Sequence, residues 1–96
     1  MERKKLSAEE IEKKLKSLDG WNTEDNNLKK RFAFENFAES LNFVNKVGEI
    51  AEKFDHHPDI FFGWGYAELN LTTHDRGGIT DFDFAVATEI EKISSK

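Results

Sequence analysis

All three histidines of this chain lie close together, between positions 56 and 74, among residues that could assist them in chemistry. Glu52 precedes the pair His56-His57, and Pro58 follows it directly. Histidine exchanges protons near neutral pH because its ordinary pKa is about 6.5, and its ring nitrogens also bind metals. The cluster therefore predicts either general acid-base catalysis or a metal site.

The backbone expected around the histidine pair favours proton transfer over a metal site. Pro58 cannot continue a helix and disfavours helical conformation at His57, so the pair should lie where a helix ends and a strand begins. Adjacent residues of extended backbone point to opposite sides, whereas zinc sites commonly take two ligands from one helix face. A metal-dependent enzyme is the weaker interpretation.

Each candidate residue also has an ordinary structural explanation, and spacing alone leaves these explanations open. Any of the histidines could be a loop residue, and His56 would sit favourably near the negative end of a helix. Glu52 could be a solvated helix charge, Trp64 a core residue and Asp83 a helix-capping residue.

Composition limits the classes of protein to which the chain can belong. Its 96 residues predict a single domain over positions 1–96. A net charge of −5 opposes a phosphate backbone, so we expect no nucleic-acid partner. The absence of cysteine excludes disulfides and thiolate zinc sites. No apolar run resembles a signal peptide or a membrane span, so we expect a cytoplasmic protein without a membrane partner.

Three capping signatures predict three helices. Each joins a cap residue to an acidic residue three positions on: Ser7 with Glu10, Asn36 with Glu39, and Thr80 with Asp83. In the second helix, apolar residues recur at three- and four-residue steps and should face the core. These residues are Phe37, Leu41, Val44, Val47, Ala51 and Phe54, broadened by Phe43 and Ile50.

Alternating segments around turn residues predict two hairpins. The first turns at 25–27, and the second joins a strand at 60–64 to one at 66–74 through Gly65. The order helix, hairpin, helix, hairpin, helix favours an α+β fold, a two-layer sandwich of a four-stranded antiparallel sheet with three helices on one face. The open sheet face and the edge strands lead us to expect a homo-oligomer, either a dimer or a tetramer.

The spacing of the candidate residues resembles the signature of the pterin-4a-carbinolamine dehydratases. The pattern E-x3-H-H-P-x5-W-x9-H-x8-D is filled by Glu52, His56, His57, Pro58, Trp64, His74 and Asp83. Leu18-Asp19-Gly20-Trp21 and the segment 32–54 also look like this family, so the resemblance covers nearly the whole chain. The family fold is the same sandwich that the element order predicts.

The resemblance implies dehydration of 4a-hydroxytetrahydrobiopterin to quinonoid dihydropterin, a step of tetrahydrobiopterin recycling, with a small-molecule pterin as the partner and no metal or organic cofactor. It implies that His56 and His74 form the acid-base pair and that His57 binds the pterin and supports catalysis. The substrate contacts that it implies are Glu52, Asp55, His56, His57, Thr72, Thr73, His74 and Asp75.

The resemblance also supplies an alternative from another functional class. Vertebrate relatives serve as dimerisation partners of a homeodomain transcription factor, so the chain could be a non-catalytic protein-binding module of the coactivator type. Retention of His56, His57 and His74 favours catalysis, because a pure scaffold would not need them.

Overall fold

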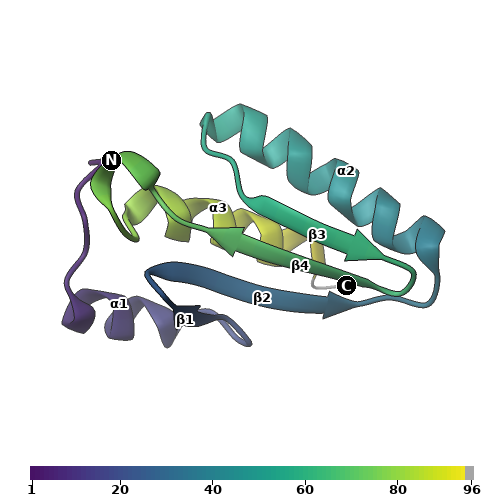
Figure 1. Ribbon diagram of the computed structural model, residues 1–96, viewed down its shortest axis with the longest axis horizontal. Coiled ribbons are helices and arrows are strands. Elements are labelled where there is room, and N and C mark those ends of the chain that lie inside the picture. The colour runs from purple at the N-terminus through teal and green to yellow at the C-terminus, as the bar shows by residue number, and fades with distance from the viewer. Residues whose placement is uncertain (95–96) are drawn as a thin grey trace.

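The computed structural model describes residues 1–94, which form an α+β sandwich with helices packed on one face of an antiparallel sheet (Figure 1). The predicted fold class is confirmed. The elements are α1 (Ala8–Leu15), β1 (Asn22–Glu24), β2 (Asn27–Ala33), α2 (Phe37–Phe54), β3 (Asp59–Gly63), β4 (Tyr66–Leu71), the short 3₁₀ helix η1 (His74–Arg76) and α3 (Asp81–Ser94). Within residues 1–94, none of the helices has the length and apolar character needed to cross a membrane.

The strands lie in the order β1-β2-β4-β3, and every neighbouring pair is antiparallel. In the first hairpin Glu24 pairs with Asn27, which leaves Asp25 and Asn26 as the turn. Both turn residues have left-handed φ angles, of 51° and 63°. This matches the two-residue turn whose twist suits a hairpin, and Asp and Asn tolerate it better than most residues.

The last strand is shorter than the alternation predicts. We expected a strand to position 74, but β4 ends at Leu71 and His74 begins η1. Gly77 adopts a left-handed φ of 71°, and the tight turn that it closes places the Gly78 carbonyl 3.0 Å from the Thr73 amide. Thr73 therefore keeps only an isolated bridge to Gly78, and His74 leaves the sheet.

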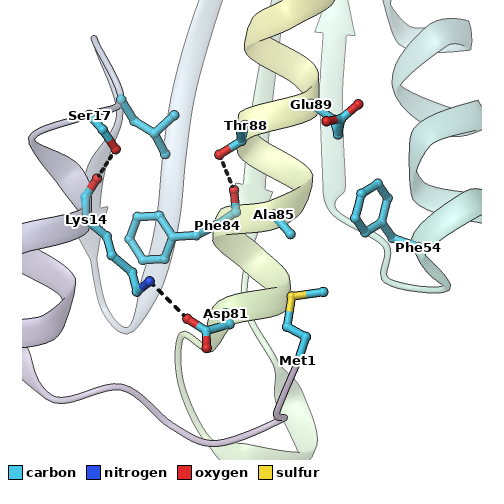
Figure 2. Close-up of a pocket in the computed structure, with 10 residues that line it drawn as sticks. Met1, Lys14, Ser17, Phe54, Asp81, Phe84, Ala85, Thr88 and Glu89 are labelled. Atoms are coloured by element: carbon cyan, nitrogen blue, oxygen red, sulfur yellow. Dashed lines mark hydrogen bonds and ion pairs between the residues drawn. The ribbon is translucent and has the colours of Figure 1, made fainter.

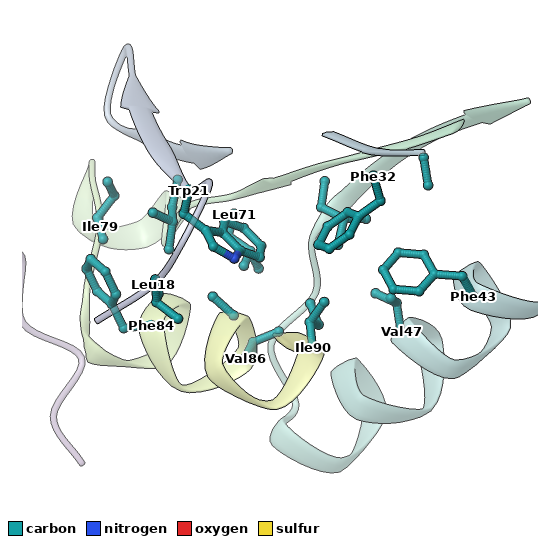
Figure 3. Close-up of a cluster of buried hydrophobic side chains, with 14 of the residues drawn as sticks. Leu18, Trp21, Phe32, Phe43, Val47, Leu71, Ile79, Phe84, Val86 and Ile90 are labelled. Carbon is teal, nitrogen blue, oxygen red and sulfur yellow. The ribbon is translucent and has the colours of Figure 1, made fainter. Parts of the chain in front are cut away.

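The core lies between the sheet and the helices, and the inward face of α2 differs from the predicted one (Figure 3). The buried residues of α2 are Ser40, Phe43, Val47 and Ala51. Phe37 and Leu41, predicted to face the core, are 45% and 40% exposed. They lie on the flank of the helix, where the Phe37 ring stacks on Phe62 at a centroid distance of 5.7 Å.

The first helix begins at its predicted cap. The Ser7 hydroxyl accepts a hydrogen bond from the Glu10 amide at 3.2 Å, and the Glu10 carboxylate accepts one from the Ser7 amide at 2.9 Å. After α1 the chain turns inward and buries Leu18 and Trp21. Figure 3 shows both side chains in the core beside α3.

Candidate active site

Three segments distant in sequence meet at one end of the sheet: the end of α2, η1 and the start of α3 (Figure 1). Asp55 ends α2 in a left-handed conformation with φ of 51°. This reversal returns the His56 amide to the Ala51 carbonyl, at 3.1 Å. The helix end therefore directs His56 inward. Pro58 prevents the helix from continuing, and β3 begins at the next residue.

His56 is bound to an acidic side chain inside the protein. Its ring is buried, with 6% of its surface exposed, and its Nε2 lies 2.6 Å from Oδ1 of Asp83. Asp83 is fully buried in the first turn of α3. A buried charge is tolerated only where hydrogen bonds satisfy it, so the partners of this carboxylate matter.

The second oxygen of Asp83 has two further partners. Its Oδ2 accepts hydrogen bonds from the Thr80 amide at 2.9 Å and from the Thr73 hydroxyl at 2.8 Å. The Thr73 and Thr80 hydroxyls lie 2.8 Å apart. Asp83 is thus the capping residue that the sequence predicts, and the same side chain also holds His56.

His57 forms a second pair, at the surface. Its Nε2 lies 2.5 Å from Oε2 of Glu52, one turn back along α2. The His57 and Glu52 side chains are 52% and 79% exposed. This imidazole is therefore accessible to a ligand, whereas the imidazole of His56 is largely enclosed.

The other predicted site residues lie nearby in the chain but make separate contacts. His74 and Asp75 are exposed in η1, and Asp55 is exposed at the end of α2. The Thr72 hydroxyl donates to the Asn26 carbonyl at 2.8 Å, so it supports the first hairpin turn. The hydrogen bonds thus join His56 to Thr73 through Asp83, and they join His57 directly to Glu52.

Two contacts at this end of the sheet were not predicted from the sequence. Thr80 was predicted only as a cap, although its hydroxyl extends the network around Asp83. The Arg3 guanidinium lies 4.6 Å from the centre of the Phe82 ring, which in turn lies 5.8 Å from the His56 ring. No local pattern could show that Arg3 and Phe82 meet, because they are far apart in sequence.

Trp64 does not belong to the core, contrary to the structural interpretation of this residue. Its side chain is 71% exposed in the turn between β3 and β4. That hairpin tip lies at the end of the sheet opposite the end of α2 (Figure 1). Trp64 is therefore neither buried nor part of the network around His56.

A surface groove lies along α3, between α1 and the end of α2 (Figure 2). Asp81 and Lys14 form an ion pair of 3.2 Å on its wall. None of the three histidines lines it. This groove is therefore separate from the histidine site.

The arrangement as a whole supports proton transfer. Asp83 fixes one imidazole in the interior, while His57 and His74 are exposed at the same end of the sheet. Imidazole can act as both acid and base near neutral pH. Among residues 1–94, no three His, Asp or Glu side chains are grouped so that they could bind a metal ion.

Comparison with known sequences gives a consistent family. The family model described as pterin 4 alpha carbinolamine dehydratase matches residues 4–93. A relative from Rubrobacter xylanophilus is 46% identical over 92% of this chain and 83% of its own. A relative from Sulfolobus acidocaldarius is also 46% identical, over 93% of this chain and 98% of its own. Both are provisionally named pterin-4-alpha-carbinolamine dehydratases.

Two solved structures are also similar. A protein from Brucella melitensis, described as a transcriptional coactivator/pterin dehydratase, superimposes with a TM-score of 0.88 at 31% identity, over 93% of this chain and 97% of that one. A pterin dehydratase-like protein, described as a RuBisCO assembly factor in the alpha-carboxysome, gives a TM-score of 0.61 at 25% identity, over 75% and 83%. The same fold thus occurs in proteins described as having different roles.

Proposed function

The chain belongs to the pterin-4a-carbinolamine dehydratase family, and we propose that it converts 4a-hydroxytetrahydrobiopterin to quinonoid dihydropterin in tetrahydrobiopterin recycling. The observation that carries this proposal is the buried pair of His56 and Asp83. It holds one imidazole in place at the end of the sheet where two further histidines are exposed, and a reaction with two proton transfers can use two such groups.

The chemistry of the reaction fits these residues. The bond between C4a and its hydroxyl oxygen breaks, and the departing hydroxide takes up a proton to leave as water. N5 loses its proton, and its electron pair forms the double bond to C4a. The step thus needs a general acid and a general base, each worth roughly 10² to 10⁴ in rate. Two histidines in opposite protonation states can supply both.

We assign His56 and His74 as the acid-base pair, and His57 as a pterin-binding residue that supports catalysis. Glu52 accepts a hydrogen bond from His57 and so would orient its ring. The Thr72 hydroxyl donates its proton to a hydrogen bond with the Asn26 carbonyl, so Thr72 would contact the pterin through its backbone. Asp55 and Asp75 are the remaining proposed substrate contacts.

We further propose that the protein acts in the cytoplasm as a homo-oligomer, without a metal or organic cofactor. The reaction only rearranges bonds and protons within the substrate, with water as the second product. It requires no electron acceptor and no group carrier. Acid-base side chains alone can therefore carry it.

The direct test is to generate the 4a-carbinolamine and follow quinonoid dihydropterin formation spectroscopically. The wild type should accelerate the reaction, and folded His56→Ala and His74→Ala variants should be slower by at least about 10². Asn42→Ala, at an exposed position on α2, is a control that should keep full activity. Unchanged activity in the presence of a chelator would separate this mechanism from a metal-dependent one.

A protein-binding module is the second candidate function. Two large apolar side chains, Phe61 and Trp64, are 62% and 71% exposed, as at surfaces that bind other proteins. A structurally similar protein is described as an assembly factor. A folded wild type that is no faster than buffer would make this module the leading interpretation.

A further inference from the structure

We propose that Asp83, Thr73 and Thr80 are positioning residues that hold His56 as the tautomer protonated on Nε2. Nδ1 is then the His56 nitrogen that exchanges a proton with the substrate. This inference rests on the proposed function, and it names the reacting atom and the residues that fix it.

The first step of the argument is the chemistry of the short contact between His56 and Asp83. Nε2 and Oδ1 are 2.6 Å apart, a hydrogen-bond distance that requires one proton between them. A carboxylic acid is a much stronger acid than an imidazolium, so this proton belongs to the nitrogen. An ionised carboxylate only accepts hydrogen bonds. Nε2 of His56 is therefore the donor, and Asp83 accepts.

The second step fixes the direction of the remaining hydrogen bonds. Oδ2 of Asp83 accepts from the Thr80 amide, which can only donate, and from the Thr73 hydroxyl. This contact uses the single proton of Thr73. In the pair of hydroxyls 2.8 Å apart, Thr80 must then be the donor. The Thr80 oxygen also lies 3.2 Å from the Phe82 amide, from which it accepts.

The network therefore has one consistent arrangement of protons, directed from α3 through two threonines to Asp83. Every member is buried: Thr80 and Asp83 are 0% exposed and Thr73 is 1% exposed. Buried networks in which every donor has an acceptor are rigid and specify one arrangement. Asp83 cannot rotate away from His56 without leaving the Thr80 amide and the Thr73 hydroxyl unpaired.

This geometry changes the role of Thr73. The sequence resemblance implies that it contacts the substrate, but its hydroxyl donates to Asp83 and accepts from Thr80. Its backbone is fixed by the bridge to Gly78, at 3.0 and 3.4 Å. Its side chain thus acts on His56 through Asp83. Any contact of Thr73 with a pterin is therefore made by its backbone.

The sharpest test replaces Asp83 by asparagine, which has nearly the same shape. The Thr80 amide and the Thr73 hydroxyl both donate toward one side of this residue, so the amide oxygen should face them. The asparagine NH₂ group then faces His56 and can only donate. His56 must accept through Nε2 and carry its proton on Nδ1. Asp83→Asn should therefore reverse the tautomer.

Long-range nitrogen–proton NMR correlation distinguishes the two tautomers directly. We expect His56 to carry its proton on Nε2 in the wild type and on Nδ1 in Asp83→Asn. The same variant should lose at least about 10² in kcat, with KM little changed, because the Nδ1 that faces the substrate then already carries a proton and cannot accept one. A change of packing alone would not reverse the tautomer.

Two substitutions of Thr73 test the network without touching Asp83, and they remain informative where Asp83→Asn does not fold. Thr73→Val keeps the shape and removes the hydroxyl. We expect kcat to fall by about tenfold, because the loss of one hydrogen bond corresponds to a change in rate of about that size. Thr73→Ser keeps the hydroxyl and should restore most of this loss. Equal losses in both variants would overturn the role of the hydroxyl.

The results separate this inference from the proposed function. An active wild type whose His56 carries its proton on Nδ1 would overturn the positioning role and leave the dehydratase assignment intact. An inactive wild type with the proton on Nε2 would overturn the dehydratase assignment, while the network would stand as the device that fixes the tautomer. Asp83→Asn with unchanged tautomer and unchanged kcat would also overturn the inference.

Discussion

The two histidine–carboxylate pairs have similar distances but very different surroundings. His56 and Asp83 are almost completely enclosed, whereas His57 and Glu52 are largely in solvent. Water screens an exposed pair, so such pairs contribute little to stability. Removing one member of a buried pair leaves the other unsatisfied, and that is costly. The two pairs should therefore respond differently to substitution.

Asp83→Ala should lower the free energy of unfolding by about 3 kcal/mol. The substitution leaves the buried His56 ring, the Thr80 amide and the Thr73 hydroxyl without their acceptor. Urea denaturation followed by circular dichroism measures the change. A loss below about 1 kcal/mol would show that water or a rearranged side chain satisfies these groups in the variant.

Glu52→Gln should change the free energy of unfolding by less than about 0.5 kcal/mol, because its side chain is 79% exposed. We expect the dehydratase rate to fall, because a neutral amide orients and supports the His57 imidazole less well than a carboxylate does. Parallel denaturation and rate measurements separate the two effects. Unchanged activity would reduce this pair to an ordinary surface contact.

At the scale of residues, the sequence indicated which candidate side chains lie at one end of the sheet better than how they are joined. The spacing from Glu52 to Asp83 was sufficient to select the candidate histidines and to predict the cap at Asp83. It could not show that the Asp83 cap also binds His56, because capping is a local pattern and this contact spans 27 positions. The core interpretation of Trp64 was wrong because hydrophobicity alone does not distinguish a core strand from an exposed hairpin turn.

The helices illustrate how local rules succeed at their ends and fail on their faces. The Ser7 and Asn36 caps were predicted because they depend on residues three positions apart. The face of α2 was misjudged at Phe37 and Leu41 because its apolar residues cover a wide arc, of which the sheet buries only a part. Only the position of the sheet decides which of them it buries. The prediction that the last strand reaches His74 was wrong, because Gly77 turns the chain and β4 ends at Leu71.

Gly48→Ala should stabilise the protein by about 0.5 to 1 kcal/mol. Gly48 lies in the middle of α2, and an added Cβ would have no heavy atom within 4 Å. Alanine therefore gains helix propensity without a clash. Gly65→Ala is the matched control, because Gly65 has φ of +80° and the Phe34 carbonyl would lie 3.2 Å from its Cβ. Thermal unfolding should move in opposite directions for the two variants.

The cap of α1 predicts a dependence of stability on pH. The Ser7 amide donates to the Glu10 carboxylate, and this bond, followed by that to the Ser7 hydroxyl, lowers the pKa of Glu10 below its ordinary 4.5. A lowered pKa in the folded state means stabilisation that is complete above the unfolded pKa and is lost as the pH falls through the folded value. Glu10→Gln should therefore be less stable than wild type at pH 7.

The difference should disappear well below pH 4.5, where both side chains are neutral. Urea denaturation at the two pH values provides the measurement. Glu12→Gln, which removes an exposed charge from the same helix, is the matched control. A stability difference between Glu10→Gln and wild type that persists in acid would mean that the charge on Glu10 is not its cause.

At the scale of the whole molecule, the sandwich covers one face of the sheet and leaves the other to solvent (Figure 1). The element order was enough to predict this architecture, because hairpins and caps are local and short connections leave few topologies. It could not predict how the open face is used. Alternation assigns residues to faces, but it says nothing about what covers them.

The edge strand β3 leads us to expect self-association. Phe61 is 62% exposed on this edge, where the free side of the strand has unpaired backbone groups that could bind another strand. Two copies related by a two-fold axis could pair β3 with β3 and bury this phenylalanine. Sedimentation equilibrium at micromolar concentrations should therefore report an oligomer, and Phe61→Lys should shift it toward the monomer.

Thr23→Lys is the matched control, because it places the same charge on β1, the edge strand at the other side of the sheet. This variant should remain oligomeric. Dissociation by Thr23→Lys alone would place the interface at β1, and a monomeric wild type would contradict the expectation altogether. Comparing the dehydratase rates of the monomeric Phe61→Lys and the wild type then tests whether the histidine site is complete within one chain. We expect equal rates, because His56 contacts Asp83 of the same chain.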